Sequence, residues 1–350
     1  MEHTQVSSTS SPPLFAHTAS LNDQATPPLT SFLAHPLLAK GVILPTPPIR
    51  ELVTDLRKAV MLREQGYCFT ATSGYGKSYG LAMAERELRR LFEDVPIYRH
   101  VIDNHQVPSI RAFFKHFLIT VGETKISGET YDLRIRLEHR LIDSGRSSDM
   151  KLVVMLIDEA QEMALQDFQF LKDIGNHLED AGVQLVVIMM GQDPDFTGAI
   201  DKLREAGRLD LISRFTLRRV QFRGLSTKED IQALLAAIDQ QEHPPASNCT
   251  WTQFFVPKAW QQGFRMKDQA DTLVQGLRQR LPGQSLARGV SARQLFLAIR
   301  RFLVDYADIE AKGGNLPENL WHTAIDYALI KDAAEIAAED KRKRRGRVRL

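Results

Sequence analysis

The sequence predicts an α/β protein built on a parallel sheet and followed by an all-helical region. Residues 66–92 contain a short apolar run, a loop with two glycines and a segment of helical periodicity, in that order. Further along, six apolar residues at 152–157 lead directly into two acidic residues. Such a continuous apolar run is typical of a strand buried on both faces, as in parallel sheets. From residue 224 onward only helical periodicity remains, so a second, helical unit is expected.

The loop at residues 71–78 (ATSGYGKS) has the composition of a phosphate-binding loop. Gly74 and Gly76 allow backbone N–H groups to turn toward an anion, and Lys77 adds a positive charge for the β- and γ-phosphates. The Ser78 hydroxyl is suited to ligate Mg²⁺. The general pattern G-x-x-x-x-G-K-[ST] has glycine where this loop begins with alanine, a departure expected to affect hydrolysis more than binding. The residues predicted to bind nucleotide are Ser73, Gly74, Tyr75, Gly76, Lys77, Ser78, Tyr79 and Asp158.

Two acidic residues complete the predicted site. Asp158 and Glu159 follow the apolar run, at what would be the carboxyl edge of the sheet. Asp158 is expected to hold Mg²⁺, directly or through water, and Glu159 to polarise the water that attacks the γ-phosphate. Each motif alone is also compatible with a glycine turn or a capped buried strand. Both motifs in this order indicate a protein that binds ATP and Mg²⁺ and hydrolyses the nucleotide.

Length and composition are those of a globular protein with one α/β domain and a smaller second one. The chain has 350 residues, of which 43% are hydrophobic and 25% charged. Its two cysteines, Cys68 and Cys249, suggest neither a disulfide framework nor a metal site. The sequence contains no HExxH zinc pattern, no GxSxG nucleophile motif, no secretory signal and no apolar run long enough to cross a bilayer. We therefore expect a cytoplasmic protein.

Positive charge is concentrated at the end of the sequence. The net charge is +2, yet residues 341–350 (KRKRRGRVRL) hold seven Lys and Arg and no acidic residue. Residues 1–340 therefore carry 38 basic and 43 acidic residues. A basic tail of this kind suits the phosphate backbone of nucleic acid, where each neutralised charge releases a counterion. The alternative is a tail that only aids solubility or is disordered.

Four segments are predicted along the chain. Residues 1–35 are rich in Ser, Thr and Pro and are expected to form a disordered or docking arm. Residues 36–225 are expected to form the α/β core, 226–340 a helical lid domain and 341–350 the basic tail. A capping box at 226–229 is expected to open the lid domain. Besides 152–157, the predicted strands cover 66–70, 96–103, 184–190 and 216–222. The predicted helices cover 50–64, 79–92, 109–121, 131–144, 164–180, 200–211, 228–241, 258–281, 290–306 and 317–340.

The order of these features resembles that of the AAA+ ATPases, in their initiator-like branch. The likeness includes the phosphate loop, the acidic strand, a polar strand end, an arginine before the last strand and the pattern G-x-x-x-R at 289–293. Within this branch the chain is similar to transposon-encoded regulators of the TnsC/TniB type. That similarity lies in the segments ATSGYGKS, VPSIRAFFKHFLITVG, LVVMLIDEAQE and ISRF, and the resemblance covers roughly residues 40–305. It implies an AAA+ parallel-sheet core with a C-terminal helical lid.

The resemblance assigns roles to further polar residues. Gln192 would sense the γ-phosphate, with Asp193 as the second choice. Arg293, in the first turn of a lid helix, would reach the phosphates of the same subunit. Arg214 would act on the nucleotide of the neighbouring subunit. Each of them could instead be an ordinary turn or surface residue. The competitors of Arg214 for the role across the subunit boundary are Arg204 and Arg208.

The resemblance also implies a function. Regulators of this type assemble with ATP into rings or filaments on duplex DNA, connect a target-site selector (TniQ- or TnsD-like) to the transposase, and disassemble after hydrolysis. Arg111 and Lys115, on one face of the helix predicted at 109–121, are candidate DNA contacts, and the alternative is a solvated helix edge. Two other functions stay open: a loader or remodeller of another protein, such as a helicase loader or a secretion-associated ATPase, and a nucleotide-binding switch with little turnover. Glu159 argues against the switch, because simple binding does not need a carboxylate that activates water.

Overall fold

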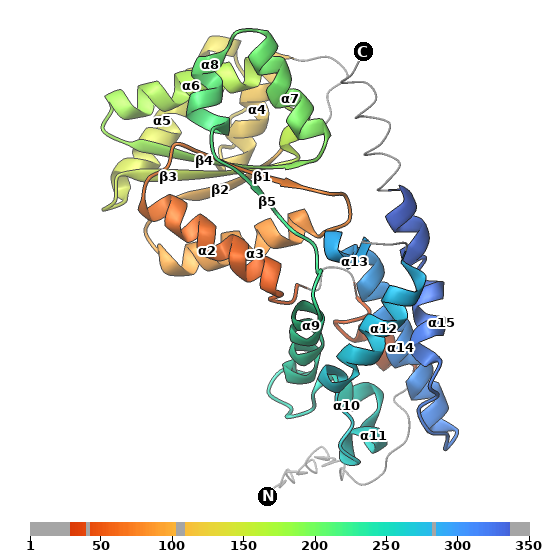
Figure 1. The fold of residues 1–350 in the computed structure, drawn as a ribbon. Helices are drawn as coiled ribbons and strands as arrows, with labels where there is room; N and C mark the ends of the chain where they lie inside the picture. The colour runs from red at the N-terminus through yellow and green to blue at the C-terminus, as the bar shows by residue number, and fades with distance from the viewer. Residues whose placement is uncertain (1–28, 40–42, 103–108, 282–284, 337–350) are drawn as a thin grey trace, which may run out of the picture.

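The computed structural model describes residues 29–39, 43–102, 109–281 and 285–336. Figure 1 shows an α/β unit, with helices on both faces of a sheet, joined to a separate group of helices. The sheet has five parallel strands in the order β2-β3-β4-β1-β5. The predicted α/β fold with a C-terminal helical region is therefore confirmed. The strands are β1 (Gly66–Ala71), β2 (Ile97–Val101), β3 (Leu152–Asp158), β4 (Gln184–Gln192) and β5 (Arg219–Gln221).

The central strands are buried because their side chains are apolar on both faces. Every residue of β3 is buried, and so is every residue of β4 between its two ends. Helices α2 and α3 cover one face of the sheet and α4 to α8 lie on the other (Figure 1), each with its own hydrophobic core. These helices are α2 (Pro47–Met61), α3 (Lys77–Leu91), α4 (Ile110–Thr120), α5 (Thr130–Ser147), α6 (Leu165–Asp180), α7 (Asp195–Glu205) and α8 (Leu209–Leu211).

The segment before β5 differs from its predicted boundaries. The helix predicted over 200–211 is two helices, α7 and α8, separated near Gly207, where φ is +69°. Ile212–Thr216 then form a π-helical turn, so β5 has three residues in place of the predicted 216–222. π-Helical turns are rare and depend on tertiary packing, so the pattern of apolar residues does not reveal this one.

The C-terminal helices form a separate unit, which we call the lid domain after its predicted role. They pack around a separate set of apolar side chains, in which the rings of Phe302 and Trp321 stack with 3.9 Å between their centroids. The capping box of α9 lies at 227–230, one residue later than the predicted 226–229. Asp230 takes the role because its buried carboxylate accepts hydrogen bonds from two N–H groups ahead of the helix. The helices are α9 (Lys228–Gln240), α10 (Trp251–Phe255), α11 (Pro257–Gln261), α12 (Ala270–Arg280), α13 (Ser285–Arg288), α14 (Ala292–Ala311) and α15 (Leu320–Tyr327).

The segment ahead of the sheet packs on the lid domain. Helix α1 (Leu29–Ala34) is followed by Leu37 and Leu44, and both leucines are buried in the hydrophobic core of the lid domain. The Arg300 guanidinium, on α14, donates a hydrogen bond to the Leu37 carbonyl. This part of the chain therefore belongs to the lid domain, although it precedes the α/β core in the sequence.

The structure corrects the predicted segment boundaries accordingly. The arm expected to be disordered over 1–35 contains helix α1 near its end, and the α/β core begins with α2 and not at residue 36. Residues 1–28 and the basic tail at 341–350 lie outside the described residues. Among the helices that the structure describes, none combines the length and the apolarity needed to cross a membrane.

One arginine connects the α/β unit to the lid domain where the chain passes between them. Arg223 follows β5 and donates to the carboxylates of Glu51, on α2, and Asp230, on α9. Burial alone would raise the pKa of Asp230, but the hydrogen bonds from Arg223 and from two backbone N–H groups hold that pKa below its ordinary value. Because one guanidinium binds both units, it restricts the angle between them.

We expect Arg223→Met to lower the free energy of unfolding by about 2 kcal/mol, because it leaves the buried Asp230 carboxylate without its cation. Urea unfolding followed by circular dichroism measures the change. Arg90→Met is the matched control: Arg90 forms an exposed pair with Glu87, and its loss should cost about 0–1 kcal/mol. Equal effects of the two substitutions would contradict the role given to Arg223.

Candidate nucleotide-binding site

The loop at 71–78 lies between β1 and α3, at the carboxyl edge of the sheet. Gly74 and Gly76 have φ values of +81° and +88°, a conformation that residues with a side chain rarely adopt. Helix α3 begins at Lys77, directly after Gly76, so the N–H groups of its first turn have no carbonyl partner within the helix. The loop therefore has the geometry of an anion-binding site at a helix N-terminus.

Lys77 places a buried positive charge at this helix N-terminus. The residue is 7% exposed, and its Nζ donates to Gln192 Oε1 at 3.3 Å. Burial lowers the pKa of Lys77, while the nearby carboxylates of Glu159 and Asp158 act in the opposite direction. An amide oxygen is a weak partner for a buried ammonium, so a phosphate oxygen would compete well for this group. The residues present thus fit a nucleotide phosphate.

Ser78 and Asp158 lie together beside the loop. The Ser78 hydroxyl forms a hydrogen bond with the Asp158 carboxylate, which also accepts the Glu159 N–H at 3.0 Å. Burial raises the pKa of Asp158, with these hydrogen bonds opposing the shift. The part of the chain that the structure describes contains no cluster of three or more His, Cys, Asp or Glu suited to a metal. One carboxylate and one hydroxyl fit Mg²⁺ that takes its other ligands from water and phosphate.

Glu159 has an unusual backbone conformation. Its φ and ψ are +55° and +37°, in the left-handed region that residues other than glycine seldom occupy. Its carboxylate accepts a hydrogen bond from the side-chain amide of Gln161. The Gln161 carbonyl oxygen in turn accepts the backbone N–H of Gln192 at 2.8 Å. Gln161 is not among the residues predicted from the sequence, and its sequence signal is its place in the segment LVVMLIDEAQE, two residues after Glu159.

Gln192 and Asp193 differ in what they contact. Gln192 touches Lys77 with its side chain. The carboxylate of Asp193, the second choice for the γ-phosphate sensor, instead accepts a hydrogen bond from the Thr197 hydroxyl near the start of α7. Of the two side chains, that of Gln192 is therefore the one that contacts the phosphate loop.

The lid domain touches the phosphate loop directly. The Gly74 carbonyl accepts hydrogen bonds from the Ser291 hydroxyl and from the backbone N–H of Arg293, both at 3.3 Å. The Tyr75 hydroxyl donates to the Gly289 carbonyl at 3.2 Å. A Cβ added at Gly74 would lie 2.6 Å from the Ser291 oxygen, so the contact requires glycine there. Arg293, the arginine predicted to reach the phosphates from the lid domain, thus contacts the loop through its backbone N–H. Its side chain is exposed.

The other predicted loop residues have different surroundings. Ser73 and Tyr79 are exposed, while Tyr75 is partly buried between the loop and the lid domain. A Cβ at Gly224 would lie 3.0 Å from the Tyr75 ring. Tyr75 therefore packs at the junction of the two units, where the chain also passes from one to the other.

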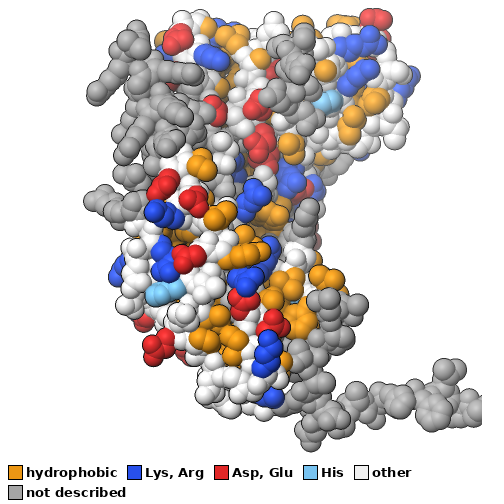
Figure 2. Space-filling view, turned by 90° about the vertical axis from the view of Figure 1, so that its right-hand side faces the viewer, with side chains coloured by type: hydrophobic (Ala, Val, Ile, Leu, Met, Phe, Trp, Pro, Cys, Tyr) orange, Lys and Arg blue, Asp and Glu red, His pale blue; other side chains and the backbone are white. Residues whose placement is uncertain are grey.

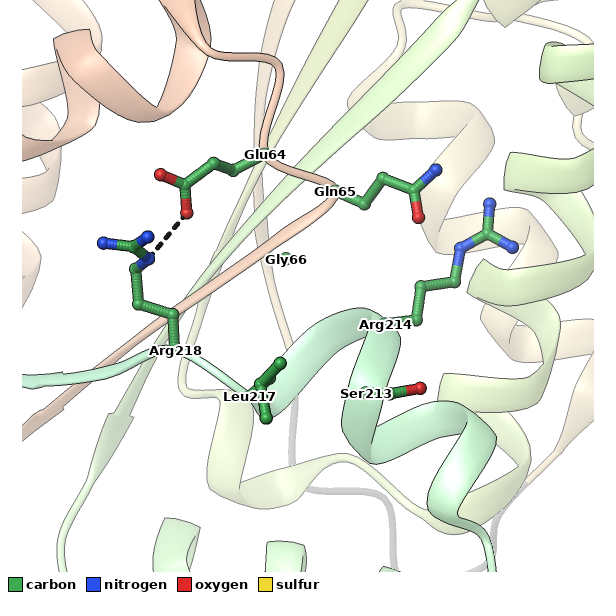
Figure 3. Close-up of a pocket in the computed structure, with 7 residues that line it drawn as sticks. All are labelled: Glu64, Gln65, Gly66, Ser213, Arg214, Leu217 and Arg218. Atoms are coloured by element: carbon green, nitrogen blue, oxygen red, sulfur yellow. Dashed lines mark ion pairs between the residues drawn. The ribbon is translucent and has the colours of Figure 1, made fainter.

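Arg214 lies at the opposite end of β1 from the phosphate loop. Its backbone carbonyl approaches Gly66, the first residue of that strand. Arg214 and Gln65 are among the residues that line an open hollow of about 540 Å³, and Figure 3 shows these residues. Its guanidinium donates to Asn176 Oδ1 and lies 3.8 Å from the Glu179 carboxylate, both on α6. The structure therefore does not bring Arg214 to the nucleotide site of its own chain.

The two competitors of Arg214 also form contacts within the chain. Arg204 pairs with Asp201 at 3.1 Å, and its side chain is 54% exposed. Arg208 binds the Asp210 carboxylate and the side chain of Gln169. Of the three arginines, Arg204 is the most exposed and Arg214, at 16%, the least.

The two candidate DNA contacts lie on α4. Arg111 donates to the Gly128 carbonyl at 2.8 Å, and Arg136 donates to two other carbonyls of the same loop between α4 and α5. Arg111 thus helps to hold that loop in place. Lys115 lies one turn further along α4 and is partly exposed.

Residues 62–199 match the family model of an AAA domain. The matched segment contains the phosphate loop, Asp158, Glu159 and Gln192. The match covers less than half of the chain, and it indicates that this segment has the P-loop nucleotide-binding fold of an AAA domain. No curated protein matches the chain in sequence.

Several solved structures are similar to the chain, and one of those described below has a TM-score above 0.5. The ORC2 protein of Aeropyrum pernix, in complexes with ADPNP and ADP, has a TM-score of 0.53 and 14% identity, over 84% of this chain and 71% of that one. Drosophila ORC bound to DNA has a TM-score of 0.49 and 15% identity, over 90% and 70% of the two chains. The ORC1 protein of Aeropyrum pernix in complex with DNA gives 0.48 and 13%, over 83% and 67%. At this identity, the first similarity shows the AAA+ fold alone.

We expect Asp158→Asn to stabilise the nucleotide-free protein by about 1 kcal/mol at neutral pH while weakening Mg²⁺-dependent nucleotide binding. Burial raises the pKa of Asp158 above its ordinary value of 3.8, so the folded state binds more protons than the unfolded state just above pH 3.8. Wild-type stability should therefore fall, relative to the Asn variant, as pH rises from 3.8 through the raised pKa. Chemical unfolding between pH 4 and pH 8 measures this difference. Asp308→Asn, at an exposed position on α14, is the matched control, and a parallel pH dependence of wild type and Asp158→Asn would contradict the assignment.

Proposed function

We propose that this protein hydrolyses ATP at the site formed by its phosphate loop and the end of β3. One observation carries the proposal: Lys77, the Ser78–Asp158 pair and Glu159 meet Gln192 at one edge of the sheet. Each group has the chemistry that phosphoryl transfer to water requires.

The binding step uses the loop and Lys77. The N–H groups at the start of α3 and the Lys77 ammonium hold the β- and γ-phosphate oxygens of the substrate. To do so, Lys77 Nζ leaves Gln192 Oε1, and the Gln192 amide becomes free to donate to the γ-phosphate. Ser78 and Asp158 would hold Mg²⁺, which when bound neutralises charge on the phosphate oxygens.

The hydrolytic step depends on Glu159. Its carboxylate orients a water molecule for attack on the γ-phosphorus and accepts a proton from it. The lid domain closes over the loop through Ser291 and Gly289, which limits the access of bulk water. Arg293 stands at the start of α14, within reach of phosphates bound at the loop.

We expect Glu159→Gln to reduce the rate of phosphate release by at least about 100-fold, because an amide cannot accept the proton. Affinity for ATP should stay the same or increase, since a negative charge near the phosphates is removed. Release of inorganic phosphate and binding of a fluorescent ATP analogue measure the two quantities. Glu162→Gln, at an exposed position three residues further on, is the matched control. Wild-type turnover in the Glu159 variant would exclude that residue as the base.

For the biological role, we propose an ATP-dependent, DNA-binding regulator of transposition that links a target-site selector to a transposase. The resemblance of the sequence to TnsC/TniB-type regulators supports this proposal, as does the concentration of positive charge at 341–350. On the face shown in Figure 2, Lys and Arg side chains are interspersed with Asp and Glu. A tail with seven basic residues is therefore the stronger candidate for contact with the DNA backbone, and Lys115 on α4 is a second one.

Assembly into a homo-oligomer is part of the proposal, with one arginine acting on the neighbouring subunit. The candidates are Arg204, Arg208 and Arg214. Arg214 would have to leave Asn176 and Glu179 to reach across a boundary, whereas Arg204 would leave only an exposed ion pair. An alanine variant of the acting residue should still assemble with an ATP analogue but fail to release phosphate.

We expect large assemblies on duplex DNA with a slowly hydrolysed ATP analogue but not with ADP, and a steep loss of DNA binding as salt increases. Sedimentation and fluorescence anisotropy with labelled duplex measure assembly and affinity. Deletion of residues 341–350 should weaken the DNA complex without changing nucleotide affinity. Assembly that is indifferent to DNA would contradict this role and favour a loader or remodeller of another protein, with the tail as a docking arm for an acidic partner.

A further inference from the structure

Gln161 connects the strand β4 to the carboxylate of Glu159. It lies in a short 3₁₀ turn, Ala160–Glu162, between β3 and α6. Its carbonyl oxygen accepts the Gln192 N–H at 2.8 Å, and its amide nitrogen donates to Glu159 Oε2. A primary amide can accept at one atom and donate at another, which a carboxylate or an apolar side chain of similar size cannot do.

The backbone N–H that Gln161 accepts, that of Gln192, belongs to a strand paired on both sides. Gln192 ends β4, the strand that pairs with β3 on one side and β1 on the other. Its register partner in β1 is Ala71, and the following N–H, that of Asp193, donates to the Ala71 carbonyl at 2.9 Å. The Gln192 N–H is therefore fixed by pairing with the strand that enters the phosphate loop.

Glu159 is held by separate neighbours at its backbone and at its side chain: its carbonyl accepts the Glu162 N–H at 3.0 Å. Its left-handed conformation is uncommon for a residue with a side chain, and such outliers persist where the surroundings hold them. The backbone N–H of Glu159 binds the Asp158 carboxylate, while its side chain is held by Gln161. Asp158 thus holds the backbone of Glu159, and Gln161 holds its carboxylate.

We propose that Gln161 is a positioning residue that sets the location of the Glu159 carboxylate relative to the end of β4. This inference rests on the proposed hydrolysis of ATP and concerns the same site. Lys77 contacts the Gln192 side chain, whereas Gln161 contacts the Gln192 backbone. When Lys77 moves to a phosphate, the backbone contact is retained, so the Glu159 carboxylate stays in place while the Gln192 side chain turns to the substrate.

The first test compares Gln161→Leu with Gln166→Leu, the same change at an exposed position at the start of α6. We expect Gln161→Leu to lower kcat about 10- to 100-fold with KM for ATP within about twofold of wild type, because a misplaced base affects the chemical step and not binding. The control should leave both constants unchanged. The full-length protein is used, and thermal unfolding confirms that each variant is folded.

A second readout does not depend on turnover. Hydrogen exchange at the Gln192 amide should become faster in nucleotide-free Gln161→Leu and stay at the wild-type rate in Gln166→Leu. In Gln161→Glu the ionised carboxylate can still accept the Gln192 N–H, but it repels the Glu159 carboxylate in place of donating to it. We therefore expect Gln161→Glu to keep the Gln192 amide protected and yet to lose kcat, an outcome that a purely structural role for the contact would not produce.

A double-mutant cycle shows whether Gln161 acts through Glu159. If it does, Gln161→Leu should cause no further loss of kcat in a Glu159→Gln background. Three outcomes would each overturn the inference while leaving the proposed function intact: additive losses in the cycle, a wild-type kcat in Gln161→Leu, or unchanged exchange at the Gln192 amide in Gln161→Leu. A wild-type protein that releases no phosphate, or a Glu159→Gln variant with wild-type turnover, would instead remove the proposed function and the positioning role with it.

Discussion

The parallel pairing of β1 with β4 and of β4 with β3 brings the ends of three strands to one edge of the sheet. The loop after β1 supplies Lys77, the end of β3 supplies Asp158, and the end of β4 supplies Gln192. These polar groups are far apart in the sequence and share an environment only because the strands are paired in this register. A shift of one residue in β4 would turn the Gln192 side chain to the other face of the sheet. The site thus depends on backbone pairing that buried apolar strands maintain.

The parts of the fold that local sequence determines were predicted well. The apolar runs of β3 and β4 mark buried strands, and the glycines before Lys77 mark a turn that requires positive φ. The parts that depend on long-range contacts were not predicted. The short β5 follows a π-helical turn, and the interaction of Arg214 with α6 joins segments with no shared sequence pattern. Gln161 was missed for the same reason, because its partner on β4 is known only once the sheet has been built.

Among the residues that the structure describes, side chains connect the two units where the chain leaves the sheet and again at the phosphate loop. Arg223 binds both units where the chain leaves the sheet, and Ser291 binds the Gly74 carbonyl of the phosphate loop. The first contact is an ion pair with a buried carboxylate, and the second is a hydrogen bond between partly buried groups. A movement of the lid domain about Arg223 would therefore displace Ser291 and Arg293 from the loop. The occupancy of the loop and the orientation of the lid domain are physically linked through these contacts.

The lid domain is discontinuous in the sequence. Its core contains Leu37 and Leu44 together with residues from α9 to α15, and the hydrogen bond from Arg300 to Leu37 spans 263 residues. The whole α/β unit is inserted between these two contributions. A fragment that begins at α9 would consequently expose the apolar surface that α1 and its neighbours cover. During synthesis the first contribution has to remain unpaired until the helices from α9 onward are made, which places the closing of this core after the synthesis of the α/β unit.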